Sequence, residues 1–375
     1  MSRWGVYVHV PWCRVICPYC AFAVIRDRAR PDRPAAFDAW ADGIARELAL
    51  RRPEFPGEAE TVYLGGGTPS RLPIPVIARV VGLFPRIADA EVTAEVNPED
   101  VSDGWLADLV AAGVNRVSMG VQSFQPRHLA RLRRPSPVDA LRAVSSAGLR
   151  SWSADLIFGL PDGTLEELDD DLDRLLAADP PHVSVYGLTI EEGTPFAREA
   201  ARGRLQPADD DLWRAMYDRL VERLGAAGLE RYEVSNFARP GHESRHNQGY
   251  WQDRPCLALG PSAHGLAPDG ARWVNHAELD TWLAAADPTA EREPPDPDRQ
   301  ARDHLISGLR AREGVDLDAL AGRFGRAPDS AAVDRLVKAG FLDHTGGRVR
   351  LVGEGWPLAD AVVARVIDAL RPTSG

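Results

Sequence analysis

Three of the four cysteines in the chain lie within eight residues, in the stretch HVPWCRVICPYCAF. Three residues separate Cys13 from Cys17, and two separate Cys17 from Cys20. Thiolates this close together ligate iron-sulfur clusters or zinc. A structural zinc site usually takes four protein ligands in two separated pairs, and no second pair is present. We therefore expect a 4Fe-4S cluster with one iron left free of protein ligands. A chance grouping of buried cysteines is the alternative.

The composition is that of an ordinary globular protein. The 375 residues are 44% apolar and 26% charged, and no run of about 18 uncharged apolar residues predicts a membrane span. No signal-peptide pattern follows Met1. Four cysteines do not make a disulfide framework, so we expect a reducing, cytoplasmic location, with peripheral membrane contact left open. The net charge of -11 opposes general nucleic-acid binding.

Short β-rich runs alternate with longer amphipathic segments in the first 230 residues. The expected strands are residues 5–10, 61–64, 91–96, 116–121, 153–158 and 183–189. The expected helices are residues 36–50, 75–84, 102–112, 137–147, 165–178 and 209–228. Six βα units in series predict an α/β fold with a parallel sheet curled into a partial (βα)6 barrel of the TIM type.

The alternation stops near residue 230, and further domains follow. We expect residues 1–230 to form the barrel, 231–287 an extension of it, and 288–300 a proline-rich linker. Residues 301–375 show the order helix, helix, helix, hairpin, helix, which predicts a small winged-helix-like domain. Its basic and acidic residues are almost equal in number. We therefore expect a structural or partner-docking role, with DNA binding as the alternative.

The cysteines follow the first predicted strand, at the end of the barrel where such folds carry their chemistry. A second loop at the same end contains YLGGGTPS, after the second strand. Three consecutive glycines, Gly65 to Gly67, expose backbone N–H and C=O groups that suit a small polar ligand. A simple tight turn is the alternative interpretation.

The CxxxCxxC motif after the first strand of a partial barrel resembles the radical S-adenosylmethionine (SAM) superfamily. This resemblance implies that the amino and carboxylate groups of SAM chelate the open iron. It also implies that an electron from the cluster cleaves the sulfonium to a 5'-deoxyadenosyl radical. Further segments, YVHVPWC, CPYCAF, YLGGGTPS, EVNPE, RVSMGVQSF, DLIFGLP and HNQGYW, resemble the anaerobic coproporphyrinogen dehydrogenase group and, within it, the HemW heme chaperones.

The resemblance implies a set of residues that contact SAM: Tyr7, Tyr19, Gly66, Gly67, Thr68, Glu95, Gln122, Arg134 and Asp155. Physical chemistry supports two of them independently. Glu95 and Asp155 are carboxylates in otherwise apolar strands, where a buried charge needs a partner such as an ammonium group or ribose hydroxyls. The alternative for each residue is a local hydrogen bond that fixes a neighbouring loop.

Two differences favour the chaperone branch. The dehydrogenases carry a further cysteine two positions after the third, where this chain has Phe22, as the HemW-like sequences do. The HNxxYW element is present as His246, Asn247, Tyr250 and Trp251. A histidine can ligate heme iron and aromatic rings can pack on a porphyrin, so these four residues form a candidate heme site. Core anchoring with a hydrogen-bonded histidine is the alternative.

The sequence thus predicts a HemW-like protein that carries a 4Fe-4S cluster and SAM, binds heme as cargo and passes it to an acceptor hemoprotein. The rivals are a coproporphyrinogen dehydrogenase and a DNA-binding redox regulator. Ala21 stands where relatives often have aspartate, so a role for that side chain is in doubt. We interpret Cys256 as a buried small residue, with a heme or cluster ligand as the alternative. No catalytic residue, acceptor or oligomeric state is assigned, and His9, His264 and His276 have no predicted role.

Overall fold

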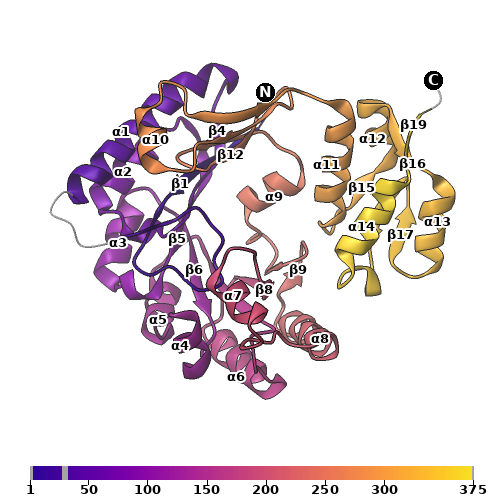
Figure 1. Cartoon of the computed structure of the whole chain (residues 1–375), viewed down its shortest axis with the longest axis horizontal. Coiled ribbons are helices and arrows are strands. Elements are labelled where there is room, and N and C mark those ends of the chain that lie inside the picture. Colours follow the sequence, from indigo (N-terminus) through magenta and orange to yellow (C-terminus); the bar gives the residue numbers. More distant parts are fainter. Residues whose placement is uncertain (1–2, 28–32, 374–375) are drawn as a thin grey trace.

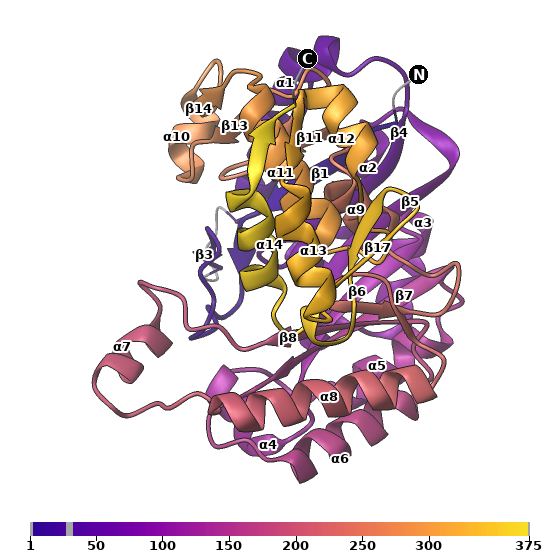
Figure 2. The same ribbon diagram turned by 90° about the vertical axis from the view of Figure 1, so that its right-hand side faces the viewer.

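The computed structural model describes residues 3–27 and 33–373. Six parallel strands lie side by side in chain order: β1 (Gly5–Val10), β4 (Ala59–Gly66), β5 (Arg86–Val96), β6 (Arg116–Gln122), β7 (Ser151–Phe158) and β8 (His182–Gly187). Figure 1 shows helices on the outer face of this curved sheet, namely α1 (Arg33–Arg51), α2 (Ile74–Gly82), α3 (Asp103–Ala111), α4 (Pro126–Leu132), α5 (Val138–Ser146), α6 (Leu165–Leu176) and α8 (Asp210–Ala226). The predicted partial (βα)6 barrel is confirmed. Helix α7 (Pro195–Ala201), between β8 and α8, stands out from the rest of the molecule in Figure 2.

The sheet continues beyond the six strands at both edges. β11 (Cys256–Leu259) pairs in parallel with β1 and is a seventh parallel strand that the periodicity did not indicate, because it has four residues and follows an irregular segment. Beyond it, antiparallel to one another, lie β12 (His264–Leu266), β13 (Arg272–Asn275) and β14 (Thr289–Glu293). At the other edge β10 (Asn236–Ala238) and β9 (Glu230–Arg231) follow β8. Two further helices belong to this part, α9 (Arg245–Trp251) and α10 (Leu279–Ala284).

The linker predicted at residues 288–300 is wrong in part, because this segment contains β14 and the start of α11 (Pro297–Leu309). Its charged residues indicated a linker, but they form ion pairs. Arg272 contacts Glu293 at 2.6 Å and Arg292 contacts Glu54 at 2.8 Å. Charged side chains are common on a strand at the open edge of a sheet, since they discourage pairing with another chain.

The C-terminal part has the predicted winged-helix-like order. After α11 come β15 (Val315–Asp316), α12 (Leu317–Phe324), β16 (Arg326–Pro328), α13 (Ser330–Lys338), β17 (Leu342–Thr345), β18 (Arg348–Leu351), α14 (Ala359–Asp368) and β19 (Leu370–Pro372). The hairpin β17–β18 pairs with β15 to form a small antiparallel sheet. Contacts with the barrel fix this domain in place: Arg214 pairs with Glu354 at 2.6 Å, and the guanidinium of Arg231 lies 4.1 Å from the centre of the Trp356 ring.

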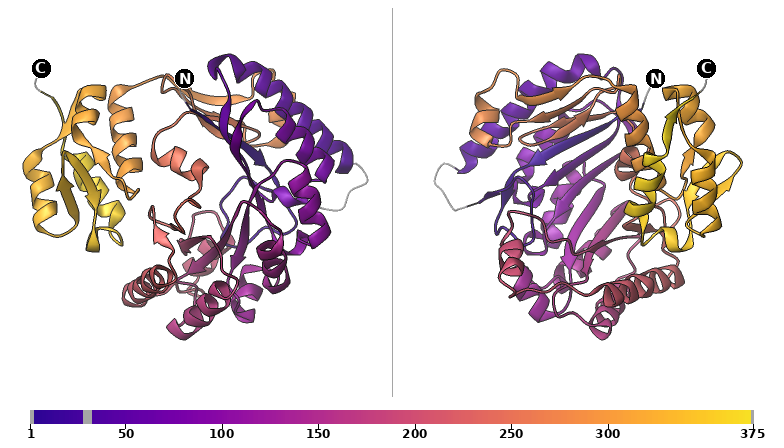
Figure 3. Two further views of the ribbon diagram at one scale, coloured as in Figure 1. Left: turned by 180° about the vertical axis from the view of Figure 1, so that it is seen from behind. Right: turned by 45° about the vertical axis from the view of Figure 1, so that its right-hand side comes forward.

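The barrel strands carry apolar side chains outward and polar side chains inward. On β5, Val92 and Ala94 are buried in the main core, whereas Thr93 and Glu95 alternate with them. Figure 3 shows the curve of the sheet. The same alternation on the other strands places a set of polar residues on its inner face: Thr61, Ser118, Ser153, Asp155 and Ser184. Since successive residues of a strand point to opposite faces, this pattern gives the barrel a polar interior.

A buried carboxylate fastens α1 to the extended edge of the sheet. Glu47 accepts hydrogen bonds from the backbone N–H of Gly260 (2.9 Å), the amide of Asn275 (2.7 Å) and the indole of Trp282 (3.0 Å). It also pairs with Arg51, itself buried, at 3.4 Å. Segments more than 200 residues apart in the chain therefore meet at this one side chain.

We predict that Glu47→Ala lowers the free energy of unfolding by about 3–5 kcal/mol, because Arg51 and three buried donors lose their acceptor. Urea denaturation followed by tryptophan fluorescence measures the change. Glu54→Ala, which breaks the more exposed pair with Arg292, is the matched control and should cost less than about 1 kcal/mol. Equal effects of the two substitutions would contradict the role given to Glu47.

Candidate cluster and cofactor site

A short pair of parallel strands, β2 (Trp12–Cys13) and β3 (Ile25–Arg26), closes the base of the cysteine loop. The backbone N–H of Ile25 donates to the carbonyl of Pro11 at 2.6 Å, and that of Cys20 donates to Cys17 at 3.2 Å. All three cysteines of the motif are half-buried and line one cavity of about 510 Å³ at the carboxyl ends of the barrel strands. The loop therefore lies where the motif and the predicted strand placed it.

Partial burial changes the acidity of two thiols of this loop, Cys13 and Cys20. Burial raises the pKa of Cys13 to about 11, although the hydroxyl of Thr68 donates to its sulfur at 3.4 Å. Burial also raises the pKa of Cys20. Metal binding replaces the thiol protons, so ligation would release them. Within the described residues no three His, Cys, Asp or Glu side chains converge closely enough to hold a single metal ion.

The glycine segment at the end of β4 packs directly on the base of the cysteine loop. Gly66 has φ +102°, and a Cβ there would lie 2.5 Å from the His9 ring. A Cβ at Gly67 would lie 2.7 Å from the carbonyl oxygen of Val10 and 2.8 Å from that of Trp12. Only glycine allows the two chain segments to approach this closely. The glycines thus do more than form a turn, because they hold β4 against the cluster loop.

Two carboxylates face the cavity, and neither forms an ion pair with a residue that the structure describes, although the charge of Arg116 acts on Asp155. Glu95 accepts from the Tyr63 hydroxyl at 2.9 Å and from the N–H of Gly66 at 3.1 Å. Asp155 accepts from the hydroxyls of Ser118 (3.2 Å) and Ser153 (3.3 Å). Burial raises the pKa of Glu95 to about 7, to which the nearby Asp155 charge adds, and burial also raises the pKa of Asp155. A cationic or hydroxyl-bearing ligand is the natural complement of such a site.

Arg134 and Gln122 also line this cavity and bring polar hydrogen atoms to it, Gln122 from the end of β6, the strand between those of Glu95 and Asp155. The guanidinium of Arg134 donates to the carbonyl of Gly120 at 2.7 Å, and its buried Nε has no partner among the described residues. Gln122 ends β6 at an irregularity in the pairing and has φ +70°, which is unusual for a residue with a side chain. Its position must therefore be held by the structure behind it.

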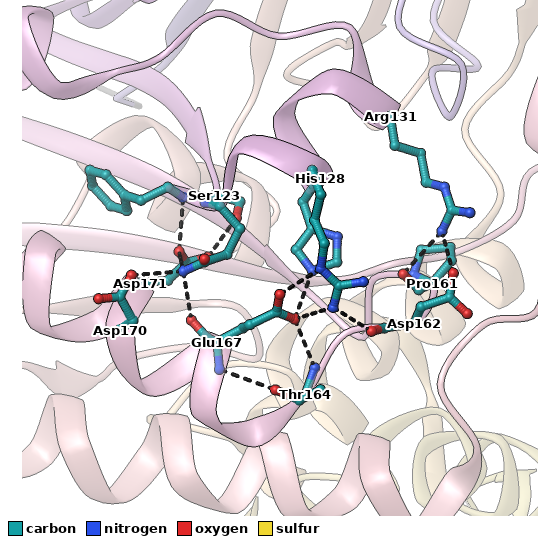
Figure 4. Close-up of polar contacts among 12 residues, drawn as sticks. Ser123, His128, Arg131, Pro161, Asp162, Thr164, Glu167, Asp170 and Asp171 are labelled. Carbon is teal, nitrogen blue, oxygen red and sulfur yellow. Dashed lines mark hydrogen bonds and ion pairs between the residues drawn. The ribbon is translucent and has the colours of Figure 1, made fainter.

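A polar network on the residues that directly follow Gln122 in the chain supplies that support, and Figure 4 shows it. Asp171, buried on α6, accepts from the Ser123 hydroxyl (2.7 Å), the Phe124 N–H (2.9 Å) and the Gln125 side-chain amide (3.0 Å).

Nearby, the Glu167 carboxylate caps α6 together with Thr164 and contacts the ring of His128 at 3.2 Å. Hydrogen bonds from Arg127 lower the pKa of Glu167 to about 2. Sequence patterns did not single out these residues. The available signal was Asp171 itself, an acid on the apolar stripe formed by Leu168, Leu172 and Leu175.

Eight of the nine residues predicted to contact SAM line the same cavity as the three cysteines: Tyr19, Gly66, Gly67, Thr68, Glu95, Gln122, Arg134 and Asp155. Tyr7 does not line it. Its hydroxyl is hydrogen-bonded to Nδ1 of His9 at 3.1 Å, and its side chain lines a second, adjoining cavity.

The HNxxYW residues lie on α9. His246 is buried against the amino-terminal ends of β1 and β4. Its Nδ1 is 2.8 Å from the Thr61 hydroxyl, its Nε2 is 3.0 Å from the Tyr250 hydroxyl, and its ring stacks on Tyr63 at 4.9 Å. Burial lowers the pKa of His246 to about 3. Neither ring nitrogen is left for iron, so this geometry opposes His246 as a heme ligand and fits the hydrogen-bonded alternative.

The other HNxxYW residues differ in exposure. Asn247 takes part in the helix cap through its N–H, which donates to Ser244 at 3.3 Å. The buried indole N–H of Trp251 has no partner among the described residues. Tyr250 keeps its hydroxyl inside but is 42% exposed, since its ring borders cavities. Beside it lies Cys256, a buried thiol whose pKa burial raises to about 12, in agreement with its interpretation as a small core residue.

A second cavity, of about 450 Å³, adjoins the first. It lies between the cysteine loop, β1, α9 and the start of β12, and its lining is Tyr7, His9, Ala21, Phe22, Ala23, Gly66, Glu95, Tyr250, Ser262 and His264. Four of these residues also border the first cavity: Ala21, Phe22, Gly66 and Glu95. A ligand in either cavity would therefore lie close to the other.

We predict that Gly67→Ala impairs cluster assembly, because the added methyl group forces the glycine segment away from the cysteine loop. Iron content and visible absorbance after anaerobic reconstitution should fall by at least about half. Gly82→Ala is the control, since a Cβ at the end of α2 meets nothing within 4 Å. Full iron loading of Gly67→Ala would contradict the close approach.

We also predict that Asp171→Ala weakens SAM binding on the order of tenfold, because the loop that holds Gln122 loses its anchor. Calorimetric titration of the cluster-loaded protein measures the affinity, and Asp171→Asn should restore part of it by keeping an acceptor for the Phe124 N–H. Asp173→Ala, on the exposed face of the same helix, is the control. Unchanged SAM affinity together with an unchanged iron content would refute this positioning role.

Comparison with known proteins agrees with the geometry. The model of the radical SAM superfamily matches residues 7–175, and that of the HemN C-terminal domain matches residues 296–358. A solved structure of coproporphyrinogen III oxidase (HemN) from Escherichia coli superposes with a TM-score of 0.82 over 97% of this chain and 90% of that chain. At 23% identity this likeness shows the fold.

Several relatives match most of the chain, barrel and C-terminal domain included. The heme chaperone HemW of Mycobacterium tuberculosis (strain H37Rv) is 38% identical over 97% of this chain and 94% of its own length. That of Escherichia coli K12 is 38% identical over 71% of each chain, and that of Lactococcus lactis is 30% identical over 97% of each. With this degree of identity across both the barrel and the C-terminal domain, the chain belongs to the HemW family of the radical SAM superfamily.

Proposed function

We propose that this protein holds a 4Fe-4S cluster on Cys13, Cys17 and Cys20, binds SAM beside it, and acts as a heme chaperone that delivers heme to an acceptor hemoprotein. The observation that carries the cofactor part is the 510 Å³ cavity, where three thiols meet two half-buried carboxylates that form no ion pair with any residue the structure describes. When bound, the cluster would supply single electrons to SAM. The cargo part rests on the relatives, which are named heme chaperones.

The residues around the cavity fit the groups of SAM. The amino group and sulfonium of SAM are positive and suit the carboxylates of Glu95 and Asp155. The SAM carboxylate suits Arg134, whose buried Nε lacks a partner among the described residues. These contacts are electrostatic and gain strength from burial, because water is excluded from both partners.

Phe22 separates this proposal from the dehydrogenase alternative. The dehydrogenases carry a cysteine at this position, whereas Phe22 is 68% exposed at the mouth of the cavities. An apolar side chain there offers no thiol for redox chemistry. The fold is shared with HemN, but at 23% identity the likeness carries no activity.

The C-terminal domain is proposed as a docking or structural element. Its helix α11 packs against α9, so it reaches the HNxxYW segment directly. In the part of the chain that the structure describes, no helix has the length and hydropathy to cross a membrane. We place the protein in the cytoplasm on its cysteine usage, and we leave the acceptor and any contact with a membrane surface unassigned.

We predict that the anaerobically reconstituted protein binds heme stoichiometrically and releases it to apomyoglobin, used as a probe, at a rate that rises with the probe concentration. It should leave coproporphyrinogen unchanged in the presence of SAM and a reductant. Heme absorbance and chromatography of porphyrin products measure both. The Cys13→Ala variant is the control for cluster-dependent effects.

Absence of heme binding by the reconstituted protein would remove the basis of the chaperone proposal. Formation of vinyl-bearing porphyrins would identify a dehydrogenase instead. Salt-dependent retardation of a DNA duplex would support the redox-regulator alternative.

A further inference from the structure

The second cavity contains two histidines, and only one has a free ring. His9 is 5% exposed; its Nδ1 is 3.1 Å from the Tyr7 hydroxyl and its Nε2 is 2.9 Å from the Ala23 carbonyl oxygen. His264, the first residue of β12, is exposed, and its ring forms no hydrogen bond with any residue the structure describes. Only His264 therefore offers the cavity an imidazole nitrogen without a competing partner.

Histidines elsewhere do not replace it at this position. His246 does not line the cavity. Both of its ring nitrogens are hydrogen-bonded, one to the Thr61 hydroxyl and the other to the Tyr250 hydroxyl. Deep in the barrel, His182 is likewise bonded at both nitrogens, to Ser153 (2.7 Å) and Tyr232 (2.8 Å). A metal ligand must present a lone pair, so these rings would first have to break buried hydrogen bonds.

The remaining walls present aromatic surface and small residues, with the carboxylate of Glu95 on the side of the first cavity. Phe22 is 68% exposed, and Tyr250 borders the cavity with its ring while its hydroxyl is bonded to His246. Tyr7 likewise has its hydroxyl engaged, by His9. Large apolar side chains left exposed together around a concavity are typical of a ligand site. A flat aromatic ligand would cover these rings and remove them from water.

We propose that His264 is the axial ligand of the heme iron and that the porphyrin lies in the second cavity against Phe22 and Tyr250. This inference rests on the proposed heme-binding function and locates its site. The cavity volume of about 450 Å³ falls within the range of small-molecule sites. The HNxxYW histidine then has a positioning role, because His246 fixes the ring of Tyr250 that forms one wall.

The location has a consequence for the cluster. Ala21 and Phe22 follow Cys20 directly and border both cavities, as do Gly66 and Glu95. Heme in the second cavity would contact Ala21 and Phe22, which belong to the same loop as the third cysteine. We therefore expect heme binding to alter the paramagnetic resonance spectrum of the reduced cluster.

The test is a heme titration of the full, cluster-loaded protein and its His264→Ala variant. We expect the variant to bind heme at least tenfold more weakly and to lose the absorbance and resonance signature of a histidine-ligated iron. Added imidazole should restore that signature, which separates loss of a ligand from loss of the fold. His276→Ala is the matched control, since His276 lies nearby on the chain after β13 but does not line the cavity.

A second variant, His246→Gln, keeps a polar group near Tyr250 and should retain the histidine-ligated signature. If His264→Ala binds heme with the wild-type affinity and spectrum, or if His246→Gln alone loses the signature, the assignment to His264 is wrong while heme binding stands. If the wild-type protein binds no heme, the proposed function itself fails.

Discussion

The carboxylate of Glu95 is half-buried at the carboxyl ends of the barrel strands, its donors among the described residues are neutral, and the proposed cofactor site is built around this side chain. Tyr63 and the N–H of Gly66 supply its hydrogen bonds. Because a buried charge with neutral partners is unfavourable, the pKa of Glu95 is raised to about 7. The site is therefore prepared for a positively charged ligand, whose binding would relieve this unfavourable state.

The same arrangement links the carboxylate to the cysteine loop. Gly66 donates to Glu95 from a backbone conformation with φ +102°, and a Cβ there would lie 2.5 Å from the His9 ring. His9 in turn is bonded to the carbonyl of Ala23, three residues after the last cysteine of the motif. The positions of the carboxylate, the glycine segment and the loop thus depend on one another, and a change in one propagates to the others.

Sequence patterns predicted the parts of this protein that are local or periodic. The cysteine spacing, the glycine segment and the alternating strands each leave a signal within a few residues, and the structure places them together as expected. The family resemblance also implied that Gln122 contacts the ligand, and the structure places Gln122 at the cavity. The signals failed where tertiary contacts decide, since β11 is a short strand stabilised by its place beside β1, and β14 is a charged edge strand that resembles a linker.

Side-chain partners could not be obtained from one sequence. The sequence singled out His246 as a candidate ligand and gave His264 no role, yet Thr61, from a strand 185 residues away, occupies one nitrogen of His246. Asp171 lies on the apolar face of α6, a pattern that predicts only core packing. Its contact with the residues that follow Gln122 is known only from the fold. Tyr7 lies on β1, the strand that precedes the cysteine loop. Its side chain contacts His9 and lines the second cavity.

The central claim is that the three thiolates and the two carboxylates serve one site for cluster and SAM. The most direct measurement is electron-nuclear double resonance of the reduced cluster with SAM labelled with ¹⁵N at its amino group. The account predicts a ¹⁵N coupling that shows the amino group on the open iron, and it predicts that this coupling is weakened in Glu95→Gln. A cluster that forms on the three cysteines but shows no coupling to the labelled SAM would contradict the account.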